Sequence, residues 1–111
     1  EVRFDRVLVD APCSNTGVLR RRIELRWRIQ PEEITRLAAE QAKLLHRAAE
    51  RVRPGGVLVY STCSLEPEEN EHVVDAFLRD HPEWTQVVRR TLHPVQTPVD
   101  GAFAAKLLRA A

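Results

Sequence analysis

Two short apolar runs, each leading directly into a cysteine-bearing segment, constrain the fold of this chain more than any other feature. The run Phe4–Val9 precedes the segment DAPCS, which holds Asp10 and Cys13, and the run Val57–Tyr60 precedes the segment STCS, which holds Cys63. Short apolar runs rich in β-branched residues are typical of buried strands. Because the carboxyl ends of strands in an open α/β sheet line the ligand crevice, we expect these three polar side chains to share one pocket.

A long amphipathic helix is expected between the two strands. Pro31, followed by two glutamates, suits the first turn of a helix. Apolar residues then recur at helical spacing as far as Val52, with one polar break at Gln41. We expect the helix to stop at Pro54-Gly55-Gly56, a turn that leads into the second strand. Residues 14–30, which show no sustained periodicity, are interpreted as a loop.

A second helix is expected to start at Pro67 and to end at His81-Pro82. Its start is rich in acidic residues, which we interpret as matching the positive end of the helix dipole rather than as a metal or acid–base site. These residues are Glu68, Glu69 and Glu71.

The last part of the chain predicts two strands joined by a turn. The run 84–92 shows mixed alternation, residues 95–101 form a turn region, and the run 102–108 fits a final strand, although its alanines also suit a helix. Strands that alternate with crossover helices predict an α/β fold with a parallel sheet. The final two strands, which have no helix between them, are expected to pair antiparallel.

Composition narrows the class of protein. A chain of 111 residues with 30% charged residues and a net charge of +1 is typical of one soluble domain at most, and no apolar run approaches the ~20 residues of a membrane span. We expect a cytoplasmic protein. The two cysteines are expected to be reduced, and no metal site is expected, because the histidines and cysteines show no ligand spacing. The absence of methionine indicates a piece of a longer protein.

Each candidate site residue also has a structural interpretation. Cys63 precedes a helix start, where the dipole favours a reactive thiolate, but cysteines without a disulfide are often simply buried core residues. The same applies to Cys13. Asp10 suits the presentation of a carboxylate to a ligand, but aspartate at a strand end is also a common turn former. From the residues alone, both interpretations stay open.

The combination of motifs resembles a known family. DAPCS followed by TGV, an arginine-rich stretch with Trp27, and then YSTCS followed by EENE, is similar to the NOL/NOP/Sun family of RNA cytosine carbon-5 methyltransferases. The resemblance extends from residue 4 to about residue 108 and includes an Asp100-Gly101 segment. Within the family, the chain is most similar to the bacterial Sun-type ribosomal RNA enzymes.

This resemblance implies a fold, a reaction and roles for three residues. The fold would be the carboxyl-terminal half of a Rossmann-like sheet that binds S-adenosylmethionine. Cys63 would add to carbon 6 of cytosine, Cys13 would assist release of the methylated product, and Asp10 would hold the base edge and lie close to the cofactor. Physical reasoning alone does not assign the two thiols, because DNA cytosine methyltransferases use the cysteine of a similar Pro-Cys motif as nucleophile.

The arginine-rich stretch is the candidate RNA-binding segment. Its arginines could grip phosphates and Trp27 could stack on a base, and the RNA implied by the resemblance is ribosomal. A solvated charged loop is the alternative interpretation. The candidate residues are Arg20, Arg21, Arg22, Arg26 and Arg28.

The cofactor-binding half of such an enzyme is not recognisable in this chain, because it contains no glycine-rich loop after a strand. We therefore expect residues 1–111 to be part of a catalytic domain, to bind S-adenosylmethionine weakly or not at all, and to be inactive alone. The strand Phe4–Val9 would lack its inner neighbour, and such an edge favours self-association.

Two other function classes fit parts of the sequence. One is a noncatalytic RNA-binding module in which the arginine-rich stretch does the binding and the thiols are structural. The other is a cysteine hydrolase with His72 as the base for Cys63, which the sequence disfavours because no third orienting group is apparent.

Overall fold

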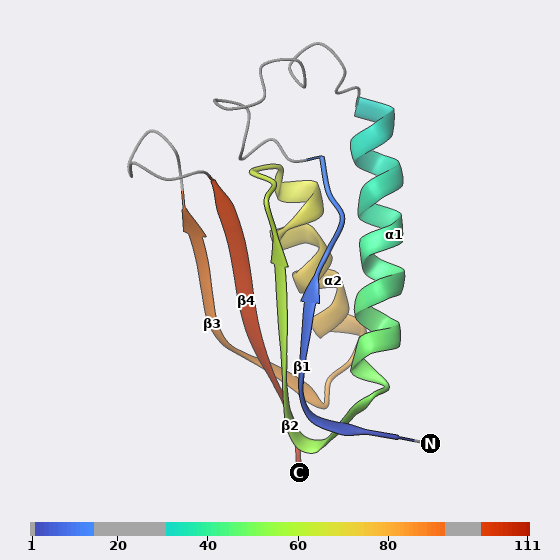
Figure 1. Cartoon of the computed structure of the whole chain (residues 1–111), viewed down its shortest axis with the longest axis vertical. Coiled ribbons are helices and arrows are strands. Elements are labelled where there is room, and N and C mark those ends of the chain that lie inside the picture. Colours follow the sequence, from blue (N-terminus) through green and yellow to red (C-terminus); the bar gives the residue numbers. More distant parts are fainter. Residues whose placement is uncertain (1, 15–30, 93–100) are drawn as a thin grey trace.

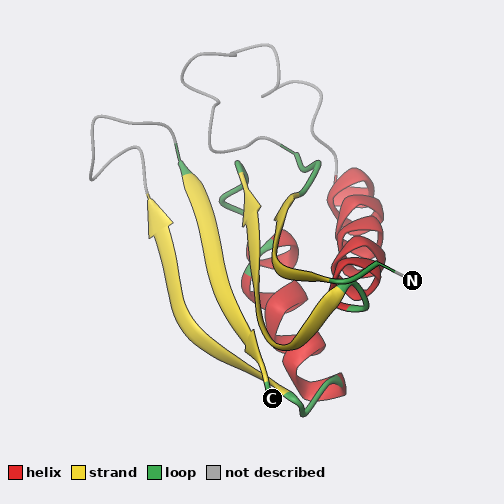
Figure 2. Ribbon diagram, turned by 60° about the horizontal axis from the view of Figure 1, so that its bottom comes forward, coloured by secondary structure: helices red, strands yellow, loops and turns green. Residues whose placement is uncertain are grey.

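In a computed structural model of the chain, the described residues 2–14, 31–92 and 101–111 form a four-stranded sheet with two α-helices on one face (Figures 1 and 2). Neither helix is long and apolar enough to cross a membrane. The α/β class is confirmed. The elements are β1 (Phe4–Asp10), α1 (Pro31–Ala49), β2 (Val52–Thr62), the short 3₁₀ helix η3 (Pro67–Glu69), α2 (Glu71–Asp80), β3 (Trp84–Leu92) and β4 (Ala102–Arg109).

The sheet has the order β1-β2-β4-β3, so the last strand is inserted between β2 and β3. β1 and β2 are parallel, whereas β4 is antiparallel to both of its neighbours. The prediction of parallel strands with a final antiparallel strand is therefore confirmed. As a result, the carboxyl ends of β1, β2 and β3 and the start of β4 lie at one edge of the sheet, at the top of Figure 1.

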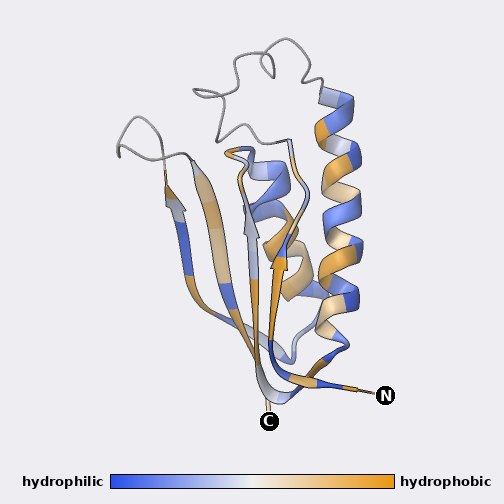
Figure 3. Ribbon diagram, in the orientation of Figure 1, coloured by the Kyte–Doolittle hydropathy of each residue, from blue (hydrophilic) through white to orange (hydrophobic). Residues whose placement is uncertain are grey.

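The core lies between the sheet and the two helices. It is built from fully or almost fully buried side chains of β2, β4 and both helices, which supply the apolar area that stabilises a domain of this size. β1 and β2 are hydrophobic along their middle and more polar toward their carboxyl ends (Figure 3). The largest apolar side chains with less than 2% exposure are Leu45, Val52, Leu58, Tyr60, Val74, Phe103 and Leu107.

The prediction that the first strand is buried is wrong, although the strand itself is confirmed. Phe4 and Leu8 on β1 are 50% and 67% exposed. β1 is an edge strand that pairs only with β2 among the described strands, and the helices cover only one face of the sheet. Side chains on the other face of β1 therefore stay exposed.

The boundary between the first helix and the second strand also differs from the prediction. α1 ends at Ala49, and Val52 already belongs to β2, so the predicted turn Pro54-Gly55-Gly56 lies within the strand. Gly55 has φ of 83°, a conformation that favours glycine, and its N–H donates to the carbonyl of Ala110 at 3.2 Å. The pairing of β1 with β2 is irregular at this level, which accommodates the bend.

The second helical segment begins with η3 rather than with an α-helix. Pro67 opens η3, and the α-helix starts only at Glu71. The end of α2 at Asp80, directly before His81-Pro82, confirms the predicted stop. The strand 84–92 is confirmed, and the alanine-rich run 102–108 is a strand and not a helix.

Candidate functional site

The pairing of β1 with β2 brings together the first cysteine segment (residues 10–14) and the second cysteine segment (residues 61–64). Asp10 lies opposite Ser61, and the Ser61 hydroxyl donates to Oδ1 of Asp10 at 3.2 Å. The N–H of Ala11 donates to the carbonyl of Ser61 at 2.9 Å. The two cysteine segments lie about fifty positions apart in sequence. The pairing of Asp10 with Ser61 nevertheless holds them side by side where the carboxyl ends of β1 and β2 lie.

A pocket of about 420 Å³ opens at this edge and is lined by residues from all four strands. Asp10 and Cys63 both line it, as the sequence predicts, and the Cys63 side chain is exposed. Arg90 and Leu92 from β3 and Phe103 from β4 complete the opposite wall. A mostly apolar pocket with a few polar groups is the usual form of a small-molecule site.

Cys13 has a different environment from Cys63. It is half-buried and does not belong to the residues that line the pocket in the described part of the chain. No disulfide joins the two cysteines. Burial raises the pKa of the Tyr60 phenol well above its usual range, and the nearby Glu69 and Cys13 raise it further, so Tyr60 remains a neutral hydrogen-bond donor.

Glu69 connects the two cysteine segments through its side-chain carboxylate. Its side chain is fully buried, and its carboxylate is occupied by hydrogen bonds that the dipole interpretation did not anticipate. Oε1 accepts from the Ser14 N–H at 2.8 Å, and Oε2 accepts from the Ser14 and Ser64 hydroxyls at 2.6 and 2.5 Å. Gln41, the polar break predicted on α1, donates to Oε1 at 3.0 Å and to the Pro12 carbonyl at 2.8 Å.

Asn70, the next residue, fixes the second cysteine segment internally. Its Oδ1 accepts from the Thr62 hydroxyl at 2.6 Å, and its Nδ2 donates to the Ser64 carbonyl at 2.8 Å. The Ser64 N–H in turn donates to the Thr62 hydroxyl at 3.1 Å. These bonds bracket Cys63 on both sides, so its backbone is held while its side chain faces solvent.

Some predicted site residues are not placed by the structure. The candidate RNA-binding residues Arg20, Arg21, Arg22, Arg26 and Arg28, together with Trp27, lie outside the described residues. His72, the alternative base, is exposed on α2. Within the described ranges, no three potential metal ligands gather into one group.

Sequence reasoning missed Arg90, Leu92 and the structural part played by Glu69. The end of β3 reaches the pocket because β3 runs parallel to β2, an orientation that strands alternating with crossover helices predict. The predicted direction of β3 could therefore have indicated that Arg90 lies near the pocket. For Glu69 the sequence carries no such signal, since three neighbouring glutamates look alike and only one is buried.

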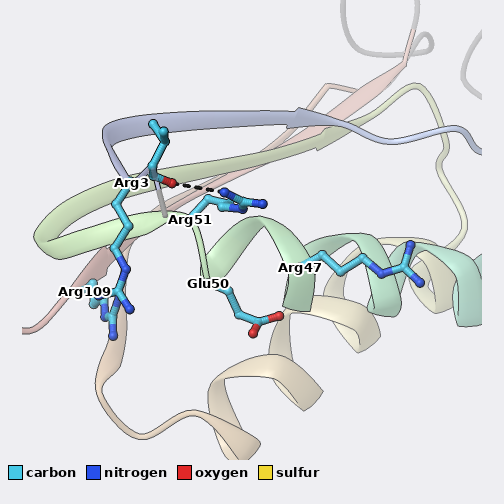
Figure 4. Close-up of a pocket in the computed structure, with 6 residues that line it drawn as sticks. Arg3, Arg47, Glu50, Arg51 and Arg109 are labelled. Carbon is cyan, nitrogen blue, oxygen red and sulfur yellow. Dashed lines mark hydrogen bonds between the residues drawn. The ribbon is translucent and has the colours of Figure 1, made fainter.

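A second pocket, of about 360 Å³, lies at the opposite end of the sheet (Figure 4). It is lined largely by Arg3, Arg47, Glu50, Arg51 and Arg109. Arg51 donates to the Val2 carbonyl at 3.2 Å, and Arg109 donates to the Val52 carbonyl. These two guanidinium groups thus satisfy backbone carbonyls next to the bend between α1 and β2.

The chain as a whole, including both cysteine segments, is similar to known proteins. A family model described as 16S rRNA methyltransferase RsmB/F matches residues 1–108. The chain belongs to this family. Membership confirms the resemblance that the two cysteine segments indicated.

Two curated RsmB/F relatives illustrate the similarity. Ribosomal RNA small subunit methyltransferase B of Thermus thermophilus is 50% identical over 118 residues, which cover 96% of this chain and 30% of the relative. The protein of the same name from Klebsiella pneumoniae is 41% identical over 120 residues, which cover 96% of this chain and 26% of the relative. The chain thus spans about a third of these proteins or less.

Solved structures share the fold of this RsmB/F chain. NSun6 from Pyrococcus horikoshii with SFG is 30% identical with a TM-score of 0.88, over 99% of this chain and 31% of that one. A methyltransferase homolog protein from the same organism is 31% identical with a TM-score of 0.83, over 97% of this chain and 40% of that one. The sheet is therefore that of a Rossmann-like methyltransferase.

Proposed function

We propose that residues 1–111 are the carboxyl-terminal part of the catalytic domain of an enzyme that methylates carbon 5 of cytosine in ribosomal RNA. One observation carries the proposal: Asp10 and Cys63 line one pocket, and the segment that holds Cys13 is hydrogen-bonded beside it. The names of the relatives, which are ribosomal RNA methyltransferases, support the substrate class.

Cys63 is the proposed nucleophile. It is the exposed thiol of the pair, and the hydrogen bonds of Thr62 and Ser64 hold its backbone. Its sulfur would form a bond to carbon 6 of cytosine, which raises the electron density at carbon 5 and prepares that carbon for alkylation. A base must leave its stack to reach the pocket, which suits single-stranded RNA.

Asp10 is the proposed anchor for the base and neighbour of the cofactor. Its carboxylate lies at the pocket wall and accepts a hydrogen bond from Ser61, which orients it. An anionic oxygen there fits both an amino group of cytosine and the positive charge of S-adenosylmethionine. When bound, this cofactor supplies the methyl group. The rest of its binding site would lie in the part of the enzyme outside this chain.

Cys13 is the proposed release group. After methylation, carbon 5 must lose its proton before the bond between Cys63 and carbon 6 can break. A half-buried thiol in the adjoining segment can approach the product without competing for the first attack. This division of labour follows from the greater exposure of Cys63, together with the family resemblance.

The arginine-rich stretch is the proposed RNA contact. We assign phosphate binding to Arg20, Arg21, Arg22, Arg26 and Arg28. Arg90 adds a cation to the lining of the pocket, where it could contact a phosphate of the RNA.

Replacing each cysteine in the full-length enzyme tests the assignment. Cys63→Ala should abolish methyl transfer and should form no covalent RNA complex, because the nucleophile is missing. Cys13→Ala should accumulate a complex that persists on a denaturing gel, because release is slowed. Methyl transfer is measured with labelled S-adenosylmethionine. If the two outcomes were exchanged, the roles of the thiols would be exchanged too.

A further inference from the structure

The Glu69 carboxylate accepts hydrogen bonds from both cysteine segments at once. Its side chain is completely buried. Two of its donors belong to Ser14, the residue after Cys13, and one belongs to Ser64, the residue after Cys63. A single carboxylate therefore joins the backbone and hydroxyl of Ser14 in one proposed catalytic segment to the hydroxyl of Ser64 in the other.

A buried carboxylate is stable only when hydrogen bonds replace its water shell. Here four donors do so: the Ser14 N–H, the Ser14 and Ser64 hydroxyls, and the Gln41 amide. Gln41 also donates to the carbonyl of Pro12, so α1 is tied to the same point. Charge-assisted bonds of this kind are short and directional, and they fix the relative position of the groups that share them.

We infer that Glu69 is a positioning residue that sets the placement of Cys13 relative to Cys63. This inference rests on the proposed function, in which one thiol attacks and the other assists release at the same base. Both steps need reacting atoms in near-attack geometry, and a shift of about 1 Å can cost on the order of 100-fold in rate. Glu69 itself touches neither substrate nor cofactor.

The hydrogen-bond donors around Glu69 explain why an apolar side chain could not take the place of its carboxylate. The groups that it binds are backbone and hydroxyl donors of loop residues, which a hydrophobic side chain would leave unsatisfied. Tyr60 donates to the backbone carbonyl of Glu69 at 2.7 Å, which also ties η3 to β2.

Glu69→Gln in the full-length enzyme tests the inference, with Glu68→Gln as the matched control at an exposed neighbour. Glutamine keeps the shape but removes the negative charge that strengthens these bonds, and it turns one acceptor oxygen into an NH2 donor. We expect kcat to fall by about 10- to 100-fold, with the KM for S-adenosylmethionine within about twofold of wild type. Hydrogen exchange should become faster in residues 10–14 and 61–66 but stay unchanged in β4, and the control should behave as wild type.

Unchanged kcat in Glu69→Gln would overturn the inference, and so would faster exchange throughout the sheet, which indicates a general loss of stability. If Glu69→Gln does not fold, Ser14→Ala and Ser64→Ala each remove one hydroxyl donor. Each should lower kcat and loosen exchange in both segments, and loosening of one segment alone would contradict the coupling. If wild-type enzyme makes no 5-methylcytosine, the proposed function fails, and hydrogen exchange still tests the coupling.

Discussion

Tyr60 is the only tyrosine of the chain, and it lies beneath the cysteine segments in a fully buried position. Its hydroxyl donates to the carbonyl of Glu69. Burial and the neighbouring Glu69 and Cys13 raise the pKa of the phenol. The folded state therefore keeps the proton of Tyr60 at pH values at which an unfolded tyrosine loses it.

Tyr60→Phe should lower the unfolding free energy by about 1 kcal/mol at pH 8, the usual net value of one buried hydrogen bond. Because the pKa of Tyr60 is raised on folding, its contribution is complete below about pH 10 and is lost as pH rises above that value. The deficit of the variant should therefore shrink between about pH 10 and 12. Urea unfolding at several pH values measures this; a constant deficit would contradict the raised pKa.

At the scale of elements, the bend at the start of β2 determines how closely β1 approaches. Gly56 has no room for a side chain: an added Cβ would lie 2.6 Å from Cγ1 of Val52 and 2.8 Å from the carbonyl oxygens of Arg53 and Asp5. Asp5 belongs to β1, so the absence of a side chain at Gly56 lets the two strands pair at this level. Gly55 differs, because an added Cβ would meet only Cβ of Ala111 at 4.0 Å, an ordinary contact, and only its positive φ favours glycine.

Gly56→Ala should destabilise the protein by about 2 to 3 kcal/mol, because two of the close atoms are backbone and cannot move aside easily. Gly55→Ala should cost about 1 kcal/mol, the price of a left-handed backbone for alanine. Thermal unfolding of the two variants gives the comparison. A larger loss for Gly55→Ala than for Gly56→Ala would show that strand approach is not the limiting factor.

At the scale of the whole molecule, the described residues leave β1 at an edge of the sheet without a further partner strand and place no helix on one face. Val2, Phe4 and Leu8 are 63%, 50% and 67% exposed there. An exposed apolar edge strand favours pairing with another chain. In a longer protein, further residues could cover this edge, and the relatives are about three to four times longer, as their coverage of 30% and 26% shows.

The isolated 111-residue chain should therefore self-associate, with a mass above the monomer in light scattering at high concentration. Leu8→Lys places a charge on the edge strand and should shift the chain toward the monomer. Leu108→Lys is the control, because β4 lies between two strands and offers no free edge. A wild-type monomer at high concentration would contradict the expectation.

The isolated chain should also bind S-adenosylmethionine weakly or not at all, and it should have no methyltransferase activity. It contains four glycines, none of them in a glycine-rich loop after a strand, so we expect the part of the site that cradles a nucleoside to lie outside these residues. Calorimetry with the isolated chain and with the full-length enzyme gives the comparison. Equal affinities would show that residues 1–111 hold the whole cofactor site.

Much of the fold could be predicted from local patterns. The strand before each cysteine segment, the helix start at Pro31 and the antiparallel final strands follow from periodicity, proline chemistry and connection rules. The burial of Phe4–Val9 could not be predicted, because an apolar strand reads the same at an edge and in the centre. The turn predicted at Pro54-Gly55-Gly56 failed because glycine permits both a turn and a bent strand that another strand approaches closely.

For the site, the sequence by itself determined the candidate residues, because Asp10, Cys13 and Cys63 belong to motifs that are readable one segment at a time. Only the tertiary structure decided which of them line a common pocket, that Arg90 joins them, and that Glu69 alone among three similar glutamates is buried. The physical reason is that reactivity belongs to a side chain and its immediate neighbours. Burial and hydrogen bonding depend on segments that meet only when the strands pair.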